Sequence, residues 1–304
     1  MVRLTDVPYP PPYTYTYDSL DQLTRENNQA AGKTWVYTYD NGGNILSKSE
    51  YAYTTGALGT ALDTISYGYG DSSWKDLLTS YDGQALTTDA IGNLTNDGTW
   101  SYSWQHGRQL KQMSRPDASG DTEMIRFRYD SSGHRIGKDS GVYHISYSGG
   151  EAVYAGETTR TSYSYLGDTL TQVNIDAPTG STSLHFTYDE IGPMSVTYNG
   201  AEYFYLKNAQ GDVTGLVNSS GTQVVAYTYD AWGNPLTTTG TMADTLGKLN
   251  PFRYRGYFYD TETGLYFLQS RYYNPETGRF INADSYALTG QGVLSGNMFA
   301  YCGN

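Results

Sequence analysis

Apolar and polar residues alternate with a period of two along most of the chain, and the apolar member is often tyrosine. The Tyr-Thr-Tyr runs at 37–39 and 227–229 are examples. Successive side chains of a strand point to opposite faces of a sheet, so both rings of each run share one face. Turn residues follow each run. The pattern predicts an all-β chain built from hairpins.

One phrase, Tyr-Thr-Tyr-Asp-x-x-Gly-Asn, recurs along the chain. Asp at the first position and Gly at the fourth suit a type I turn, because the carboxylate can bond the turn's own backbone and glycine adopts positive φ. Each copy is therefore expected to form a strand, a turn and the start of the next strand. The expected turn residues are Asp40 and Gly43, Asp130 and Gly133, and Asp230 and Gly233.

Several copies depart from the phrase at one position. Asp21 stands where the first copy should have glycine, His134 takes an Asn position, and Trp104 takes an Asp position. The pairs Asp-Gly, Gly-Gly and Asn-Gly predict further hairpins at 82–83, 97–98, 149–150 and 199–200.

Only two short segments suit a helix, residues 20–30 and residues 241–249. The proline-rich stretch 8–12 is expected to be extended. Helices therefore contribute little to the predicted fold.

Hairpins of this kind need neighbours, because a single hairpin cannot bury its apolar face. Stacked side by side, they join their tyrosine faces into one surface. Such a strip twists with a fixed hand, so we expect a long, spiralling sheet of stacked hairpins with unpaired strands at its ends. Residues 1–225 are assigned to this β-strip, and residues 226–304 to a distinct final segment.

Composition supports a folded chain with an unusual core. There are 32 tyrosines against 8 phenylalanines, and charged residues make up 16%, below the roughly 25% of an average domain. Low charge with few aliphatic residues would otherwise suggest disorder. A tyrosine ring can be buried while its hydroxyl reaches a polar partner, so the composition favours a β protein with a tyrosine core.

Charge and sequence pattern exclude several classes. The net charge of −12 argues against nucleic acid as a partner, since a basic surface is the usual requirement. No run of about 18 apolar residues is present, so no membrane span is expected, and the first residues lack the apolar stretch of a signal peptide. Cys302 is the single cysteine, which rules out an intrachain disulfide and is expected to be inert.

No cofactor or metal site is predicted. The histidines, His106, His134, His144 and His185, lack metal-ligand spacing. Motifs of serine hydrolases, zinc proteases and nucleotide-binding proteins are absent, and the Asp-x-x-Gly turns lack the ligand spacing of a calcium loop. We therefore expect a non-enzymatic chain. The tryptophans, Trp35, Trp74, Trp100, Trp104 and Trp232, are expected to pack between hairpins; stacking on glycans is the alternative.

The repeats resemble the YD repeats of bacterial Rhs proteins, Tc-toxin C components and teneurins. The stretch NPFRYRGYFYDTETGLYFLQSRYYNPETGRFINAD, residues 250–284, is similar to the Rhs-associated core segment that follows such repeats. Both arginines of its motif are expected to pair with nearby carboxylates. The motif residues are Arg271, Tyr272, Tyr273, Gly278, Arg279 and Phe280.

The resemblance implies a structural role. In this family the repeats form a sheet that spirals into a hollow shell around a variable C-terminal polypeptide, commonly a toxin, and the core segment closes one end. The chain is then a casing of a secreted polymorphic toxin, whose partner is a C-terminal effector of a longer parent, with a secreted or cell-surface location. The alternative is a cell-surface adhesin or carbohydrate-binding protein, which the tyrosine and tryptophan faces suggest; in the family, teneurins use the shell in cell–cell adhesion.

Self-cleavage is a further possibility that the resemblance raises. Cleaving members carry a DPxGL-like stretch after the GRF motif, and a second one at the cut. Here Asp284 matches the first aspartate, but Ser285 replaces proline, and the chain reaches Asn304 without a second motif. An aspartyl dyad needs two carboxylates. Asp284 is therefore a catalytic candidate only for autoproteolysis of a longer parent.

The number of repeats suggests an incomplete shell. We expect one or two coils of sheet, which gives an open or partial casing. Its open edges could pair between copies of the chain and produce a filament or oligomer.

Overall fold

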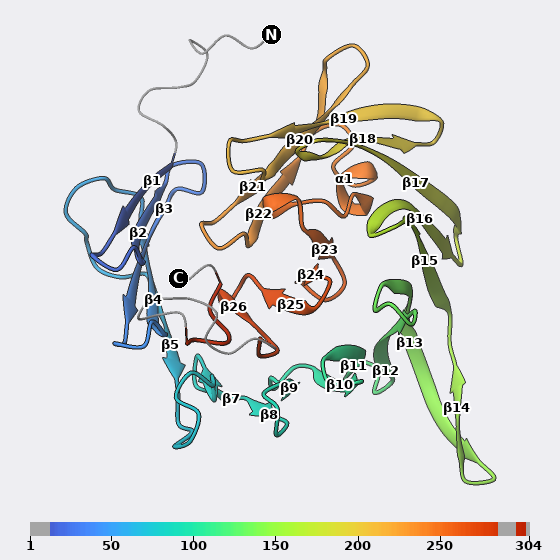
Figure 1. The fold of residues 1–304 in the computed structure, drawn as a ribbon, viewed down its shortest axis with the longest axis horizontal. Helices are drawn as coiled ribbons and strands as arrows, with labels where there is room; N and C mark the ends of the chain where they lie inside the picture. Colours follow the sequence, from blue (N-terminus) through green and yellow to red (C-terminus); the bar gives the residue numbers. More distant parts are fainter. Residues whose placement is uncertain (1–12, 285–295, 302–304) are drawn as a thin grey trace. The chain divides into compact units, whose positions relative to one another are not determined.

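The computed structural model describes residues 13–284 and 296–301 (Figure 1). Over these ranges the regular secondary structure is almost entirely strand, which confirms the predicted all-β class. The proline-rich stretch 8–12 and Cys302 lie outside the described residues. No helix among the described residues has the length and apolar character needed to cross a membrane.

The first sheet has seven strands in the order of the sequence, β1 to β7. Its strands are β1 (Tyr13–Tyr17), β2 (Leu23–Asn28), β3 (Lys33–Tyr39), β4 (Ile45–Ala52), β5 (Asp63–Gly68), β6 (Ser80–Tyr81) and β7 (Gln84–Ala85). Neighbouring strands pair antiparallel, as hairpins stacked side by side require.

The second sheet has 15 strands and also follows the sequence, from β8 to β22, with β14 paired only to β13 (Figure 1). Its first strands are β8 (Thr87–Thr88), β9 (Leu94–Asn96), β10 (Ser101–Gln105), β11 (Gln109–Pro116), β12 (Thr122–Tyr129), β13 (Arg135–Ser148), β14 (Glu151–Ala155) and β15 (Thr158–Leu166). The others are β16 (Thr169–Ala177), β17 (Gly180–Asp189), β18 (Gly192–Tyr198), β19 (Ala201–Lys207), β20 (Val213–Asn218), β21 (Gln223–Tyr229) and β22 (Pro235–Thr239). The strand order has two ends, so the sheet is not a closed barrel.

A third, four-stranded sheet is formed by the final segment. Its strands are β23 (Phe258–Asp260), β24 (Leu265–Leu268), β25 (Arg271–Asn274) and β26 (Arg279–Phe280). The helix α1 (Leu246–Leu249) and the 3₁₀ turn η2 (Tyr254–Gly256) lie between β22 and this sheet.

The chain divides into two compact units. The first comprises Met1–Leu86, Thr228–Leu236 and Pro275–Asn304, and the second comprises Thr87–Tyr227 and Thr237–Asn274. Each unit thus contains residues from both segments proposed above. The boundary between residues 225 and 226 stays a prediction about sequence motifs.

The repeat turn at Asp40 shows why its residues recur. Oδ1 of Asp40 accepts hydrogen bonds from the backbone N–H groups of Gly42 and Asn44, both at 2.8 Å. The backbone carbonyl of Asp40 accepts a hydrogen bond from the N–H of Gly43 at 3.1 Å. Gly43 has a φ of +79°, which is strained for residues with a side chain. Nδ2 of Asn44 closes the turn on Oδ2 of Asp40 at 2.9 Å. The sequence had given no reason for this Asn.

The turns at Asp130 and Asp230 follow the same scheme. The carboxylate of Asp130 accepts the N–H of His134, and that of Asp230 accepts the N–H of Asn234, both at 2.9 Å. Asp21, at the glycine position of the first copy, has a φ of +61°. Asp tolerates this conformation better than most residues, so the degenerate copy still turns.

Tyrosine hydroxyls join neighbouring hairpins at the points where their strands separate. The hydroxyl of Tyr39 on β3 donates to the carbonyl of Leu23 on β2 at 2.7 Å, just before backbone pairing of these strands begins at Arg25. The same bond recurs at 2.9–3.0 Å from Tyr69 to Ile45, from Tyr129 to Leu110 and from Tyr165 to Arg135. Tyr188 donates to the carbonyl of Leu170 in the same way. Phenylalanine could not make it, which gives a reason for tyrosine at these five positions.

We expect Tyr188→Phe to destabilise the protein by about 1–2 kcal/mol, because the carbonyl of Leu170 loses its hydroxyl partner. Tyr147→Phe is the matched control, since Tyr147 is 77% exposed. Urea unfolding of both variants measures the difference. Equal stabilities would show that the hydroxyl bond contributes nothing.

The helix predictions have opposite outcomes. The helix expected over residues 20–30 is wrong, because Leu23–Asn28 is strand β2. Pairing with β1 and β3 on its two sides satisfies its backbone and overrides local preference. The segment 241–249 does contain a helix, limited to Leu246–Leu249.

Candidate functional site

The second unit contains a buried charge cluster between the final segment and the repeat strands. Asp260 ends β23, and its Oδ2 accepts Nη1 of Arg135 at 2.5 Å, while its Oδ1 accepts Nζ of Lys138 at 3.1 Å. Nζ of Lys138 also reaches Glu262 at 2.7 Å. Asp260 and Arg135 are each only 1% exposed. The final segment is thereby fixed to β13.

Aromatic rings surround the guanidinium of Arg135. Its central carbon lies 4.3–5.3 Å from the ring centroids of Phe127, Tyr163, Phe258 and Phe267. Burial opposes ionisation of Asp260, but Arg135 and Lys138 outweigh it and hold the pKa of that carboxyl below its usual value. The three charges are therefore expected to persist inside an aromatic core.

Tyr272 of the core motif makes a second contact in this unit. Its hydroxyl lies 2.7 Å from that of Tyr129, the repeat tyrosine before Asp130, and its ring packs against Phe127 and Trp104. Tyr272 and Tyr273 are buried in β25, and Arg271 is half-buried beside them. Tyr272 thus packs onto aromatic residues of the hairpins, whereas the ring of Tyr273 packs against Tyr266 of the neighbouring strand β24.

The first unit contains the other half of the core motif. Gly278 has a φ of +68°, and a Cβ added there would lie 3.1 Å from atoms of the Trp232 ring. Trp232 belongs to the repeat turn that begins at Asp230. This close approach explains the glycine of the GRF motif.

Gly278→Ala is expected to cost about 1–3 kcal/mol more than Gly32→Ala. Gly32 has a similar φ of +66° but nothing within 4 Å of an added Cβ. The control therefore shares the backbone strain and lacks the clash with Trp232. Thermal unfolding of the two variants measures the difference, and equal losses would exclude a packing role for Gly278.

Arg279 corrects the expectation that this arginine pairs with a carboxylate. It is 2% exposed, and its Nη2 donates to the carbonyl of Asp76 at 2.8 Å and to Oδ1 of Asn297 at 3.3 Å. Asn297 in turn donates to Oδ1 of Asn44 at 2.9 Å. Burial lowers the pKa of Arg279. Neutral oxygens and the ring of Tyr69 therefore take the place of a carboxylate.

Asp284 and Phe280 lie in the same unit. The backbone N–H of Asp284 donates to the carbonyl of Met298 at 3.0 Å. The backbone N–H of Phe280 donates to the carbonyl of Phe299, also at 3.0 Å. The Asp284 side chain is half-buried. Among residues 13–284 and 296–301, no three His, Cys, Asp or Glu side chains gather as a metal site. Catalysis by Asp284 stays a prediction.

The first unit contains a pair of buried acidic residues, Glu26 and Asp230, that the sequence analysis did not predict. Glu26 on β2 is fully buried, and its Oε2 accepts the N–H of Ala231 at 2.9 Å, while its Oε1 accepts Nδ2 of Asn28 at 3.1 Å. Asp230, in the adjoining repeat turn, accepts Nζ of Lys48 at 3.1 Å. Burial, followed by the charge of Asp230, raises the pKa of Glu26 to about 8.

The tryptophans and histidines have structural surroundings. Trp35, Trp100 and Trp232 are buried, as expected for packing between hairpins. His134 lies 3.2 Å from Asp130 and 3.0 Å from Asp168, and hydrogen bonds to these carboxylates raise its pKa. The remaining histidines are His106, at positive φ in a turn, His144, beside Asp121, and His185, on β17.

The fold and the core motif together define the class of protein. The family model described as teneurin YD-shell matches residues 8–293. The chain therefore belongs to the YD-shell family. The resemblance to Rhs and Tc-toxin proteins is confirmed.

Individual relatives are much longer than this chain. The tRNA nuclease WapA of Bacillus subtilis is 33% identical over 95% of this chain, which spans 11% of that protein. A double-stranded DNA deaminase toxin A of Burkholderia cenocepacia is 26% identical over 95% of the chain and 21% of its own length. The catalytic names belong to those whole proteins.

Solved structures show the same fold. The Tc holotoxin pore of Photorhabdus luminescens matches 96% of this chain and 14% of its own, with a TM-score of 0.69 at 20% identity. A crystal structure of TcdB2-TccC3 matches 96% of the chain and 15% of its own, with a TM-score of 0.65 at 20% identity.

Proposed function

We propose that this chain is the casing part of a longer Rhs-type toxin, in which the YD-repeat sheet encloses a C-terminal effector. The observation that carries the proposal is the burial of the final segment against the tyrosine face of the repeats, through the Asp260 cluster in one unit and Gly278 and Arg279 in the other. Side chains with such partners attach each part of the core segment to the repeat residues of its own unit.

The relatives support an effector partner. Proteins named as nucleases and as a deaminase toxin share this segment, although it covers only about a tenth to a fifth of their lengths. These relatives share the segment but are named for different activities. This is expected when the activity resides in another part of the longer chain. A secreted or cell-surface location belongs to the same proposal. Pairing between copies through open sheet edges stays a prediction.

Limited proteolysis of a longer parent carrying its effector tests the proposal. The effector is expected to resist protease in the wild type and to become accessible in Asp260→Asn, which breaks the cluster with Arg135 and Lys138. Asp139→Asn is the control, since the Asp139–Arg128 pair is more exposed. An effector cleaved equally fast in the wild type and as an isolated domain would contradict enclosure.

A further inference from the structure

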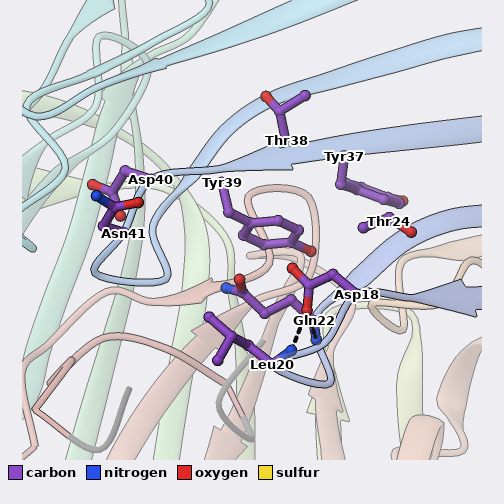
Figure 2. Close-up of a pocket in the computed structure, with 9 residues that line it drawn as sticks. All are labelled: Asp18, Leu20, Gln22, Thr24, Tyr37, Thr38, Tyr39, Asp40 and Asn41. Atoms are coloured by element: carbon purple, nitrogen blue, oxygen red, sulfur yellow. Dashed lines mark hydrogen bonds between the residues drawn. The ribbon is translucent and has the colours of Figure 1, made fainter. Parts of the chain in front are cut away.

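A cleft of about 410 Å³ lies in the first unit, where β2 and β3 separate beside two repeat turns (Figure 2). Asp18 and Gln22 line it from the first turn, and Asp40 and Asn41 from the next. The ring of Tyr39 lies over the cleft, held by the bond from its hydroxyl to Leu23. The volume is within the range of small-molecule sites.

Gln22 occupies the position that Asn44 has in the following turn. Asn44 closes its turn by donating Nδ2 to Oδ2 of Asp40 at 2.9 Å, and Asn93 donates likewise to Asp89 at 2.8 Å. Gln22 is one methylene longer and makes no such bond to Asp18. Gln22 is only 2% exposed, and its Nε2 is buried without a hydrogen-bond partner.

The free donor is directed into the cleft. In Figure 2 the carboxamide of Gln22 lies below the ring of Tyr39 and extends toward the turn of Asp40 and Asn41. A buried donor left without a partner destabilises a protein, because it has lost its hydrogen bond to water. A bound group that accepts from Nε2 would remove this penalty.

Asp18 supplies the complementary acceptor. Its Oδ1 receives the N–H groups of Leu20 at 2.8 Å and Gln22 at 3.0 Å, whereas its Oδ2 accepts no hydrogen bond from the described residues. Asp40 is already bonded through both oxygens. The cleft therefore offers one free amide donor and one free carboxylate acceptor beside an aromatic ring.

The charges decide which ligand class fits. An anion would satisfy Gln22 but would face Asp18 and Asp40 in a protein of net charge −12. A cation would satisfy Asp18 but would leave the donor of Gln22 unpartnered. A hydroxyl both donates and accepts, so two hydroxyls of one sugar can serve Asp18 and Gln22 together.

We infer that this cleft binds a neutral sugar, with one hydroxyl on Oδ2 of Asp18, another on Nε2 of Gln22 and the sugar ring against Tyr39. The inference is independent of the casing proposal. It also differs from stacking on tryptophan, because no tryptophan lines the cleft.

Titration with neutral methyl glycosides of glucose, galactose and mannose, followed by ligand-observed NMR, tests the inference. We expect saturable binding of at least one glycoside, in the millimolar range for so open a cleft. Gln22→Met should weaken it at least tenfold. Gln210→Met is the matched control, because Gln210 also lies in a repeat-type turn but is exposed.

Gln22→Asn separates loss of the site from loss of the fold. The shorter amide should reach Asp18 as Asn44 reaches Asp40, so this variant is expected to melt no lower than the wild type while losing the sugar. Absence of binding by all three glycosides, or unchanged binding in Gln22→Met, would overturn the inference. Tighter binding of glucuronate or glucosamine than of the neutral glycosides would overturn the ligand class.

Discussion

Asp260→Asn is expected to lower the free energy of unfolding by about 3–5 kcal/mol, the range measured when one partner of a buried ion pair is removed. The substitution keeps the shape of the side chain but leaves Arg135 and Lys138 without their shared, buried carboxylate. Glu262 still faces Lys138 and cannot replace the contact to Arg135. Chemical unfolding followed by circular dichroism measures the loss.

The control for this prediction is a more exposed ion pair between β12 and β13. Arg128 and Asp139 also form an ion pair, but the Arg128 side chain is 52% exposed. Asp139→Asn should therefore cost less than about 1 kcal/mol. Similar losses in the two variants would mean that the buried cluster does not hold the core segment.

Glu26→Gln is expected to abolish a steep loss of stability between pH 6 and pH 9. The pKa of Glu26 is raised to about 8, by burial and then by the charge of Asp230, with Lys48 acting in the opposite direction. Tyr13 and Tyr37 also face this carboxyl. In the unfolded chain the pKa is near its ordinary value of about 4.3.

The sign follows from proton binding. Above pH 5 the unfolded chain has released the proton of Glu26, whereas the folded chain keeps it up to about pH 8. The contribution of Glu26 to stability is therefore greatest at low pH, and above pH 5 it falls by about 1.4 kcal/mol per pH unit until pH 8. Between pH 6 and pH 9 the loss from this group is about 2.7 kcal/mol.

Glutamine has no proton to lose, so the variant should lack this component. Glu151→Gln, on the exposed strand β14, controls for the change in net charge. Denaturant unfolding at a series of pH values gives the comparison. The same pH slope in the wild type and Glu26→Gln would show that Glu26 is not the group responsible.

The hairpin architecture could be predicted because its determinants are local. Alternation of Tyr and Thr fixes the strand faces, and Asp40 with Gly43 fixes a turn within four residues. The helix expected over residues 20–30 failed because pairing partners on both sides, not the segment itself, decide its conformation.

The buried polar contacts could not be predicted, because they join residues far apart in the sequence. Asp260 looked like one more turn aspartate, yet it pairs with Arg135, 125 positions away. Glu26 contacts the turn at Ala231, 205 positions away. A pattern within one strand carries no information about such partners. The missing hydrogen bond of the Gln22 amide could be recognised only by comparison with Asn44, which makes the corresponding bond to Asp40.

Electron cryomicroscopy of a longer parent chain with its effector is the most direct measurement of the casing proposal. We predict density for the effector chain enclosed by the YD-repeat sheet, with the core segment seated on the tyrosine face through Asp260 and Arg135. A particle without internal chain density, or an effector folded outside the sheet, would contradict the proposal.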